Sequence, residues 1–310
     1  MAGPESTVVV LAGGTGGAKL ASGMLELVGD DLAVIANTGD DLEIYGAHVS
    51  PDPDLVSFWL AGRIDERGWG LAGDSFAVMD ALRALGAEVW FNLGDRDLAW
   101  CLERRRMLDG GATPTQALAA LDAALGLRAR VLPMCDEQVR TRVGTGGRIV
   151  GLQEFLIREH AAGPVDAVDF DGIDAARPTP QVLEALATAR AIVIGPSNPI
   201  ISIGPILAVP GMREALRDSA APVVAVSPLV EGRVLKGPTA SFMAGAGLPL
   251  SSAGVARAYE GVADALLADE DEGVAHMPVR IGPTLMSDAA GRRAVAEAAL
   301  ELADAVRMDA

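Results

Sequence analysis

The chain has 310 residues, of which 50% are hydrophobic and 22% charged, so it can bury a large core and is too apolar to be disordered. Its 25 Lys and Arg against 42 Asp and Glu give a formal net charge of -17, which disfavours nucleic acid and anionic membranes as partners. Cys101 and Cys135 show no disulfide or metal-ligand spacing, and we expect neither a leader nor a membrane-spanning helix, because no apolar run is long enough. We therefore expect a cytoplasmic protein.

Short β-branched runs alternate with longer helical patterns, which predicts strands joined by crossover helices in a mostly parallel sheet. The expected strands are residues 8–12, 32–36, 88–92, 129–132, 191–194 and 223–226. The expected helices are residues 17–27, 75–85, 95–107, 114–125, 180–190, 252–268 and 289–306. The predicted fold class is α/β, Rossmann-like and doubly wound with helices on both faces. We expect one elaborated domain over residues 1–310, with an inserted hairpin or lid at about 136–177.

Polar turns rich in glycine follow most of these strands. They lie at residues 13–19, 37–41, 93–97, 195–199 and 227–229. In a parallel sheet the carboxyl ends of the strands share one edge, where doubly wound proteins bind their ligands. The turns are therefore expected to converge on one cleft, although such residues are also what ordinary turns use.

The first turn, residues 13–19, places small residues between a strand and a helix. Backbone N–H groups and the positive helix end can then approach an anion. The pattern is neither a Walker A loop nor a strict G-x-G-x-x-G sequence. Lys19 in this turn and Lys236 before another Gly-Pro loop are the only lysines of the chain. They are either compact cations placed near a phosphate or exposed residues without a role.

Four aspartates follow closely after the second strand: Asp40, Asp41, Asp52 and Asp54. The alternating carboxylates of the 52–54 loop can turn oxygens toward a hard cation, and Mg²⁺ is usually held by one or two carboxylates together with substrate phosphates. We expect at least one of the four to bind a metal or act as an acid or base. The alternative is that they are turn and helix-capping residues, with His48 in a structural role.

Many of the aromatic residues lie close together in the sequence: Tyr45, Phe58, Trp59, Trp69, Phe76, Trp90, Phe91 and Trp100. They form either the core of a subdomain or a wall for a flat heteroaromatic substrate. The triplet at residues 104–106 is expected to be a solvated helix end, where cations suit the helix dipole.

The order and spacing of the motifs resemble the 2-phospho-L-lactate transferase family of deazaflavin coenzyme biosynthesis along nearly the whole chain. The matching motifs are LAGGTGGAKL at 11–20, NTGDD at 37–41, SPDPD at 50–54, RGWG at 67–70, LGDRD at 93–97, LPMCD at 132–136, GPSNPIISIGPI at 195–206 and PGM at 210–212. The bacterial members are the closer match, since they share the form of the second motif.

This resemblance implies a transferase of coenzyme F-420 biosynthesis. The donor would be a guanosine diphosphate-linked three-carbon acid, enolpyruvyl in actinobacterial-type enzymes and lactyl in archaeal ones. The acceptor would be the terminal ribityl hydroxyl of 7,8-didemethyl-8-hydroxy-5-deazariboflavin. GMP would leave and a phosphodiester would remain. The resemblance also favours a homodimer.

The family motifs assign roles to particular residues here. Asp54 would contact the deazaflavin end and the metal, while Asp40 and Asp41 would lie beside the diphosphate as metal ligands or as the base. The implied Mg²⁺ ligands are thus Asp40 and Asp54. Asn92 stands where archaeal members have a lysine that contacts the deazaflavin. The substrate-binding residues are expected to be Gly13, Gly14, Thr15, Gly16, Lys19, Asn37, Asn92, Asp95, Arg96, Gly195, Ser197 and Asn198.

Two other classes of protein share some of these features. A non-catalytic regulator that binds nucleotide sugars would share the glycine-rich start and an Asn-Thr-x-Asp-Asp turn, but it would continue that turn with small residues where this chain has Leu42-Glu43-Ile44-Tyr45. An NAD oxidoreductase is disfavoured by the glycine pattern and because Asp30-Asp31 precedes the second strand.

Overall fold

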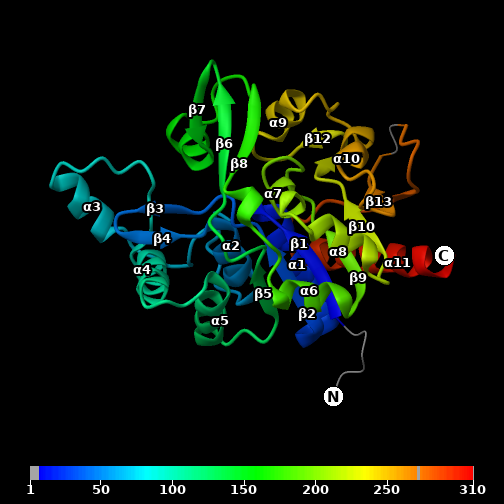
Figure 1. Ribbon diagram of the computed structural model, residues 1–310, viewed down its shortest axis with the longest axis horizontal. Coiled ribbons are helices and arrows are strands. Elements are labelled where there is room, and N and C mark those ends of the chain that lie inside the picture. Colours follow the sequence, from blue (N-terminus) through cyan, green and yellow to red (C-terminus); the bar gives the residue numbers. More distant parts are fainter. Residues whose placement is uncertain (1–6, 271–272, 310) are drawn as a thin grey trace.

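A seven-stranded, all-parallel sheet lies at the centre of the computed structural model, which describes residues 7–270 and 273–309 (Figure 1). Its strand order is β14-β13-β10-β9-β1-β2-β5. The strands are β1 (Thr7–Ala12), β2 (Leu32–Ala36), β5 (Arg130–Pro133), β9 (Ala189–Ile194), β10 (Val223–Val226), β13 (Ala265–Ala268) and β14 (Val279–Ile281). The central strands are buried on both faces, which explains their continuous apolar runs. The predicted α/β, doubly wound class is confirmed.

The order in which the chain adds strands to the sheet reverses beside β1. From β1 the chain adds β2 and β5 on one side, and it then returns to place β9 and β10 on the other side. The carboxyl ends of β1 and β9 are therefore the switch point, where open α/β sheets form a crevice.

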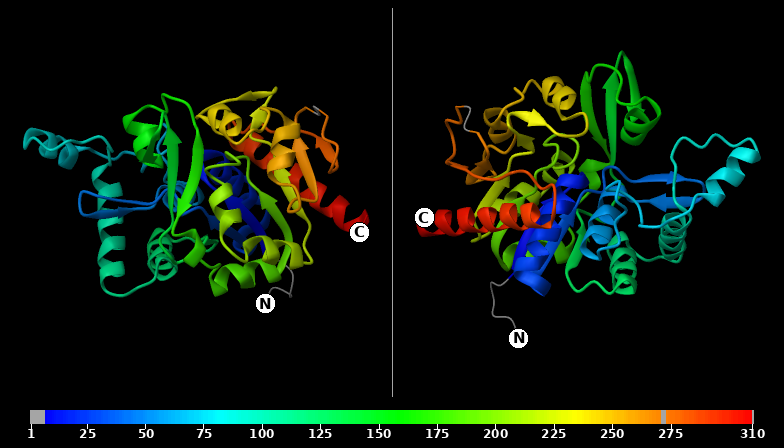
Figure 2. Two further views of the ribbon diagram at one scale, coloured as in Figure 1. Left: turned by 45° about the horizontal axis from the view of Figure 1, so that its top comes forward. Right: turned by 180° about the vertical axis from the view of Figure 1, so that it is seen from behind.

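Helices cover both faces of the sheet (Figure 2). One face carries α1 (Gly14–Val28), α2 (Pro51–Leu60), α5 (Pro114–Leu125) and α11 (Ala289–Asp309). The other carries α6 (Pro180–Ala187), α7 (Gly204–Ala208), α8 (Met212–Asp218) and α10 (Ser252–Ala258). Each layer buries its own apolar cluster against the sheet, so two cores hold the strand ends in place.

Helix α5 illustrates how local sequence sets these boundaries. Thr113 accepts a hydrogen bond from the N–H of Gln116, whose side chain accepts one from the N–H of Thr113 in return. Pro114 follows at the first helical position, where its missing N–H costs nothing. Gly126 ends the helix in the left-handed conformation with φ of 76°.

Three insertions stand on the rim of the sheet (Figure 1). The first joins the hairpin β3 (Leu42–Ile44) and β4 (Ala47–Val49) to α3 (Ala77–Ala84) and α4 (Asp95–Asp109). The second is an antiparallel sheet of β6 (Arg140–Thr145), β7 (Arg148–Gly151) and β8 (Ala167–Asp171). The third comprises β11 (Leu229–Val230), β12 (Arg233–Val234) and α9 (Thr239–Gly245). The second insertion occupies the region predicted as a hairpin or lid, and closure by it remains a prediction.

The structure corrects the predicted elements in three places. Residues 88–92 form no strand, because this segment belongs to the first insertion and packs Phe91 onto the small core there. The helix predicted over 252–268 stops at Ala258, and residues 265–268 form β13, fully inside the sheet between β10 and β14. Gly261, with φ of 71°, separates the two elements. Helix α6 likewise ends at Ala187 because β9 begins at Ala189.

Among the described residues, no helix combines the length and the apolar character needed to cross a lipid bilayer.

Candidate active site

A cavity of about 640 Å³ lies at the carboxyl ends of the central strands. Its walls come from the turn after β1, the turn after β9, the end of β10 and the loop before α9. The predicted site residues that line it are Gly13, Gly14, Thr15, Gly16, Lys19, Asp40, Ser197 and Asn198. Four of the five predicted turns therefore contribute to this cavity, whereas the turn at residues 93–97 follows no strand and lines the second cavity described below instead.

We call this cavity the sheet-edge cavity. Close packing of backbone segments shapes its floor. A Cβ on Gly16 would lie 1.9 Å from the carbonyl oxygen of Pro196, so only glycine fits there. The N–H of Gly17 donates to Ser197 Oγ at 2.9 Å, which fixes the turn after β9 against the start of α1. Gly195 holds the strand end by donating its N–H to the carbonyl of Leu11. This arrangement aims the N-terminus of α1 at the cavity, where it favours an anion.

Two buried carboxylates stand beside the glycine turn. The side-chain amide of Asn37 donates from Nδ2 to Asp40 Oδ1 and to Asp52 Oδ2, both at 2.9 Å. The N–H of Gly14 donates to Asp52 Oδ1 at 2.6 Å. Gln153 Nε2 lies 3.4 Å from Asp40 Oδ2. Asn37 thus holds the two carboxylates together at the wall of the cavity.

Burial and repulsion change the proton affinity of this pair. Desolvation, followed by the charge of Asp52, holds the pKa of Asp40 well above its usual value, against the hydrogen bond from Asn37. Desolvation likewise raises the pKa of Asp52 to about 6, although its hydrogen bonds from Asn37 and Gly14 oppose the shift. Placing a cation beside them would relieve this repulsion.

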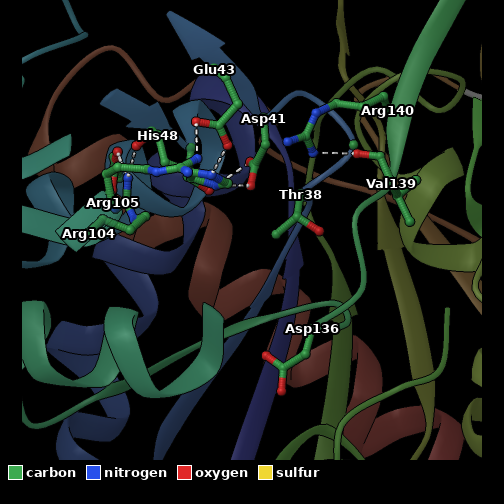
Figure 3. A network of polar contacts seen from close by, with 12 residues as sticks. Thr38, Asp41, Glu43, His48, Arg104, Arg105, Asp136, Val139 and Arg140 are labelled. Atoms are coloured by element: carbon green, nitrogen blue, oxygen red, sulfur yellow. Dashed lines mark hydrogen bonds and ion pairs between the residues drawn. The ribbon is translucent and has the colours of Figure 1, made fainter. Parts of the chain in front are cut away.

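Asp41 belongs to a different network, drawn in Figure 3. Its carboxylate accepts from Ser50 Oγ at 2.7 Å and lies 3.1 Å from His48 Nε2, while His48 Nδ1 lies 2.6 Å from Glu43 Oε1. Burial lowers the pKa of His48, but the hydrogen bond and charge of Asp41 and the charge of Glu43 outweigh it and raise the pKa. Asp41 lines neither cavity described here and braces the hairpin of β3 and β4.

Asp54, predicted as a metal ligand, forms a buried ion pair, and its role as a ligand stays a prediction. Arg104 Nη1 donates to Asp54 Oδ2 at 3.0 Å, its Nη2 donates to Oδ1, and Trp100 Nε1 donates to Oδ1 at 2.7 Å. Both carboxylate oxygens are therefore occupied. The expectation that Arg104 is solvated is wrong, because the residue is 3% exposed. Only Arg105 and Arg106 of the triplet lie at the surface.

A second cavity, of about 450 Å³, adjoins the first and is walled mainly by the first insertion; we call it the aromatic cavity. Its apolar walls include Phe58, Trp69, Trp90 and Phe91. Some of the clustered aromatic residues thus line a cavity. Others, Tyr45 and Trp100, pack against the core of the first insertion, and Trp90 does both. The polar groups on the walls are Asp52, Asp54, Asn92 and Asp97. Asp52 and Trp69 line both cavities.

The remaining predicted residues support this arrangement from the side. Asn92 lines the aromatic cavity and accepts from Arg83 Nη2 at 2.7 Å. Asp95 accepts from Ser75 Oγ and from backbone N–H groups at the start of α3, and its pKa is lowered by these hydrogen bonds. Arg96 contacts the 72–74 loop and lines neither cavity. Asp95 and Arg96 therefore hold residues 72–78 against the start of α4.

The sequence prediction missed several residues at this site. Asp52 appeared only as one of four aspartates, Trp69 only as one aromatic among several, and Gln153 had no signal at all. The burial of Arg104 could have been predicted, because Asp97, Cys101 and Arg104 recur at helical spacing. In the structure these residues of α4 lie on one face, beside Asp54.

The fold and the paired cavities define a doubly wound α/β protein with a cavity at the sheet edge beside a second cavity with aromatic walls. The chain belongs to the family described as 2-phospho-L-lactate transferase CofD, which it matches over residues 8–281. It is accordingly a transferase of coenzyme F-420 biosynthesis.

Comparisons with individual proteins agree with this family. The chain is 40% identical to a phosphoenolpyruvate transferase of Kitasatospora aureofaciens, covering 97% of this chain and 98% of that protein. It is 38% identical to the 2-phospho-L-lactate transferase of Methanosarcina mazei, covering 85% and 87% respectively. A crystal structure of a UPF0052-family protein from Bacillus halodurans shares the fold, with a TM-score of 0.58 at 20% identity over 88% of this chain and 83% of that one.

Proposed function

We propose that this chain transfers a phosphoenolpyruvyl group from a guanosine diphosphate conjugate to the ribityl hydroxyl of 7,8-didemethyl-8-hydroxy-5-deazariboflavin and releases GMP. The adjoining pair of cavities carries this proposal, because it gives the donor and the acceptor separate sites that meet at Asp52 and Trp69. The enolpyruvyl form is supported by relatives named phosphoenolpyruvate transferase, which this chain matches over 97% of its length. The homodimer expected from the resemblance remains a prediction.

The sheet-edge cavity suits the donor. Its glycine turn presents backbone N–H groups and the start of a 15-residue helix, which favour phosphate oxygens. Lys19 lies on the same wall, where its Nζ donates to the carbonyl of Met286 at 3.3 Å. Burial, followed by the charges of Arg292 and Lys236, lowers the pKa of Lys19, and a bound anion would offset this. Cationic and N–H groups thus gather here in a chain whose net charge is -17.

The aromatic cavity suits the acceptor. A deazaflavin is a flat heteroaromatic molecule, and the aromatic walls offer ring faces and edges for packing against it. Asn92 supplies an amide at the rim, in place of the lysine expected in archaeal members. The ribityl chain would then lead toward Asp52, where the two cavities meet. A site that only bound a nucleotide would not need this second cavity.

The residues present fit Mg²⁺ at Asp40 and Asp52. Both are buried carboxylates that accept hydrogen bonds from the side-chain amide of Asn37. Within the described chain, neither forms an ion pair with an Arg or Lys. Asp54 lies with Asp97 and Cys101 in a second group of possible ligand atoms, within 4.8 Å of one another, but its carboxylate already accepts from Arg104 and Trp100, so we place the ion at Asp40 and Asp52. When bound, Mg²⁺ would supply positive charge to the phosphates of the donor.

The chain's own groups have defined tasks in this transfer. The glycine turn and Ser197 orient the diphosphate, while the aromatic walls exclude water and align the acceptor hydroxyl. The carboxylate pair receives the proton of the attacking hydroxyl, and Asp52 is the member that faces both cavities. Positioning and charge neutralisation account for most of the catalysis expected of a phosphoryl transfer.

The direct test is to incubate the purified chain with deazaflavin, Mg²⁺ and either the enolpyruvyl or the lactyl conjugate of guanosine diphosphate. We expect GMP release that needs both substrates, stops with EDTA and is faster with the enolpyruvyl donor. Faster turnover of the lactyl donor would overturn the choice of acid. Tight binding of the donor without GMP release would favour a regulator over an enzyme.

A further inference from the structure

Lys236 lies at the seam between the two cavities. The loop between β12 and α9 places its Nζ 4.1 Å from the ring centroid of Trp69. Trp69 comes from the first insertion, is 51% exposed and lines both cavities, whereas Lys236 lines the sheet-edge cavity. A cation from the third insertion is thus held over an aromatic ring of the first, which is a cation–π contact.

The location of this contact follows from the proposed transfer. A donor in one cavity and an acceptor in the other can react only where the cavities meet, and Asp52 and Trp69 mark that place. We propose that Lys236 is a catalytic residue that contacts the phosphoryl oxygens during transfer, and that Trp69 is the positioning residue that holds it there. This inference rests on the proposed function of the two cavities.

The charges around the seam show why a cation is needed there. Asp40 and Asp52 place two carboxylates close together on one wall. Among the described residues that line the sheet-edge cavity, the cationic side chains are Lys19 and Lys236. Lys19 is tied to the carbonyl of Met286 and lies 5.9 Å from the ring centroid of Trp59. Within residues 7–270 and 273–309, Lys236 contacts the face of Trp69 and forms no salt bridge, so its ammonium hydrogens remain available for an anion.

The transfer itself balances without a covalent enzyme intermediate. The ribityl hydroxyl oxygen forms a bond to the β-phosphorus, which carries the three-carbon acid. The bond from that phosphorus to the bridging oxygen breaks, and its electron pair leaves on GMP. The hydroxyl proton passes to a carboxylate of the Asp40–Asp52 pair and then to water. Lys236 neutralises charge on the non-bridging and leaving oxygens, where the transition state spreads it.

The test compares Lys236→Met with Arg233→Met, an exposed cation of the same insertion that lines neither cavity. We expect Lys236→Met to lower kcat by about 100-fold, as for the loss of one aimed charge in a transition state. Its Kd for GDP, measured by calorimetry, should change less than about 3-fold, since the glycine turn carries most ground-state binding. Arg233→Met should keep the wild-type kcat.

Two further variants separate catalysis from structure. Lys236→Arg should recover only part of kcat, because a planar guanidinium cannot reproduce a compact ammonium at one site. Trp69→Leu should lower kcat in the wild-type background but not further in Lys236→Met, because the ring acts on kcat through the lysine. The increase in the acceptor KM caused by Trp69→Leu should appear both in the wild type and in Lys236→Met.

Three results would overturn the inference: an unchanged kcat in Lys236→Met, a loss of GDP affinity that accounts for the whole effect, or additive kcat losses from Trp69→Leu and Lys236→Met. A wild-type chain that releases no GMP would instead reject the proposed function, so the two failures are distinguishable.

Discussion

The sheet-edge cavity and the aromatic cavity differ in how the chain builds them. The first is made from turns that follow parallel strands, and the glycines of one turn pack directly against the backbone of the next. The second is made from an insertion whose helices and loops pack aromatic side chains around a small core of their own. The sheet topology therefore fixes the anion site, whereas side-chain packing fixes the aromatic site. The two regions should respond differently to substitution.

Asp52 joins the two regions, so Asp52→Asn should have the largest effect. The amide keeps the shape but cannot ionise, accept the proton or hold a cation as a carboxylate does. We expect kcat/KM to fall about 1,000-fold, about 4 kcal/mol of transition-state stabilisation. Steady-state GMP release checks this, with circular dichroism to show that the variant folds. A rate within 10-fold of wild type would remove Asp52 from the chemistry.

Arg104→Met tests the support of the aromatic cavity alone. It leaves Asp54 buried without its partner, which should cost about 3 kcal/mol of unfolding free energy in urea denaturation. Acceptor binding should weaken while GDP binding persists, because the sheet edge does not depend on α4. As a control, Arg142→Met breaks the half-exposed pair with Asp171 and should cost less than about 1 kcal/mol. Equal loss of GDP and acceptor binding would show that the two regions are not independent.

Asp122 on α5, which packs against α4, gives a pH test of the same support. Burial raises its pKa to about 7 from 3.8. The folded state therefore binds more protons between these values, so stability falls as the pH rises through this window. When the pH rises from about 5 to about 8, the free energy of unfolding of the wild type should fall by on the order of 2 kcal/mol more than that of Asp122→Asn. Parallel pH profiles of the two proteins in urea denaturation would refute this.

Trp90→Leu should have the smallest effect and the most local one. Removing one aromatic wall should raise the acceptor KM about 10-fold, about 1.4 kcal/mol, and leave the Kd for GDP unchanged. Acceptor titration by deazaflavin fluorescence measures the first value and calorimetry the second. An unchanged acceptor KM would place the acceptor elsewhere.

The same contrast explains what could be predicted from the sequence. The predicted bounds of β2, β10 and α5 match the structure, because apolar runs, capping residues and Gly126 carry local information. The glycine turn and Asp40 reach the predicted cavity because parallel strands place their carboxyl ends together. These features follow from topology and short-range chemistry.

The aromatic region could not be predicted as well, because tertiary contacts decide it. Residues 88–92 have strand-like composition but no neighbouring strand, and Arg104 is buried only because α2 brings Asp54 to it. The sequence pattern gave Asp54 and Asp52 equal standing, and hydrogen bonds across the fold separate their roles. Spacing along the chain does not contain that information.

The central claim is that donor and acceptor occupy adjoining cavities at the same time and that the group passes directly between them. Initial rates of GMP release, measured while both substrate concentrations are varied, test it most directly. Double-reciprocal plots should give intersecting lines, as for a ternary complex. Parallel lines, with GMP released before the acceptor binds, would show a covalent enzyme intermediate and contradict the account.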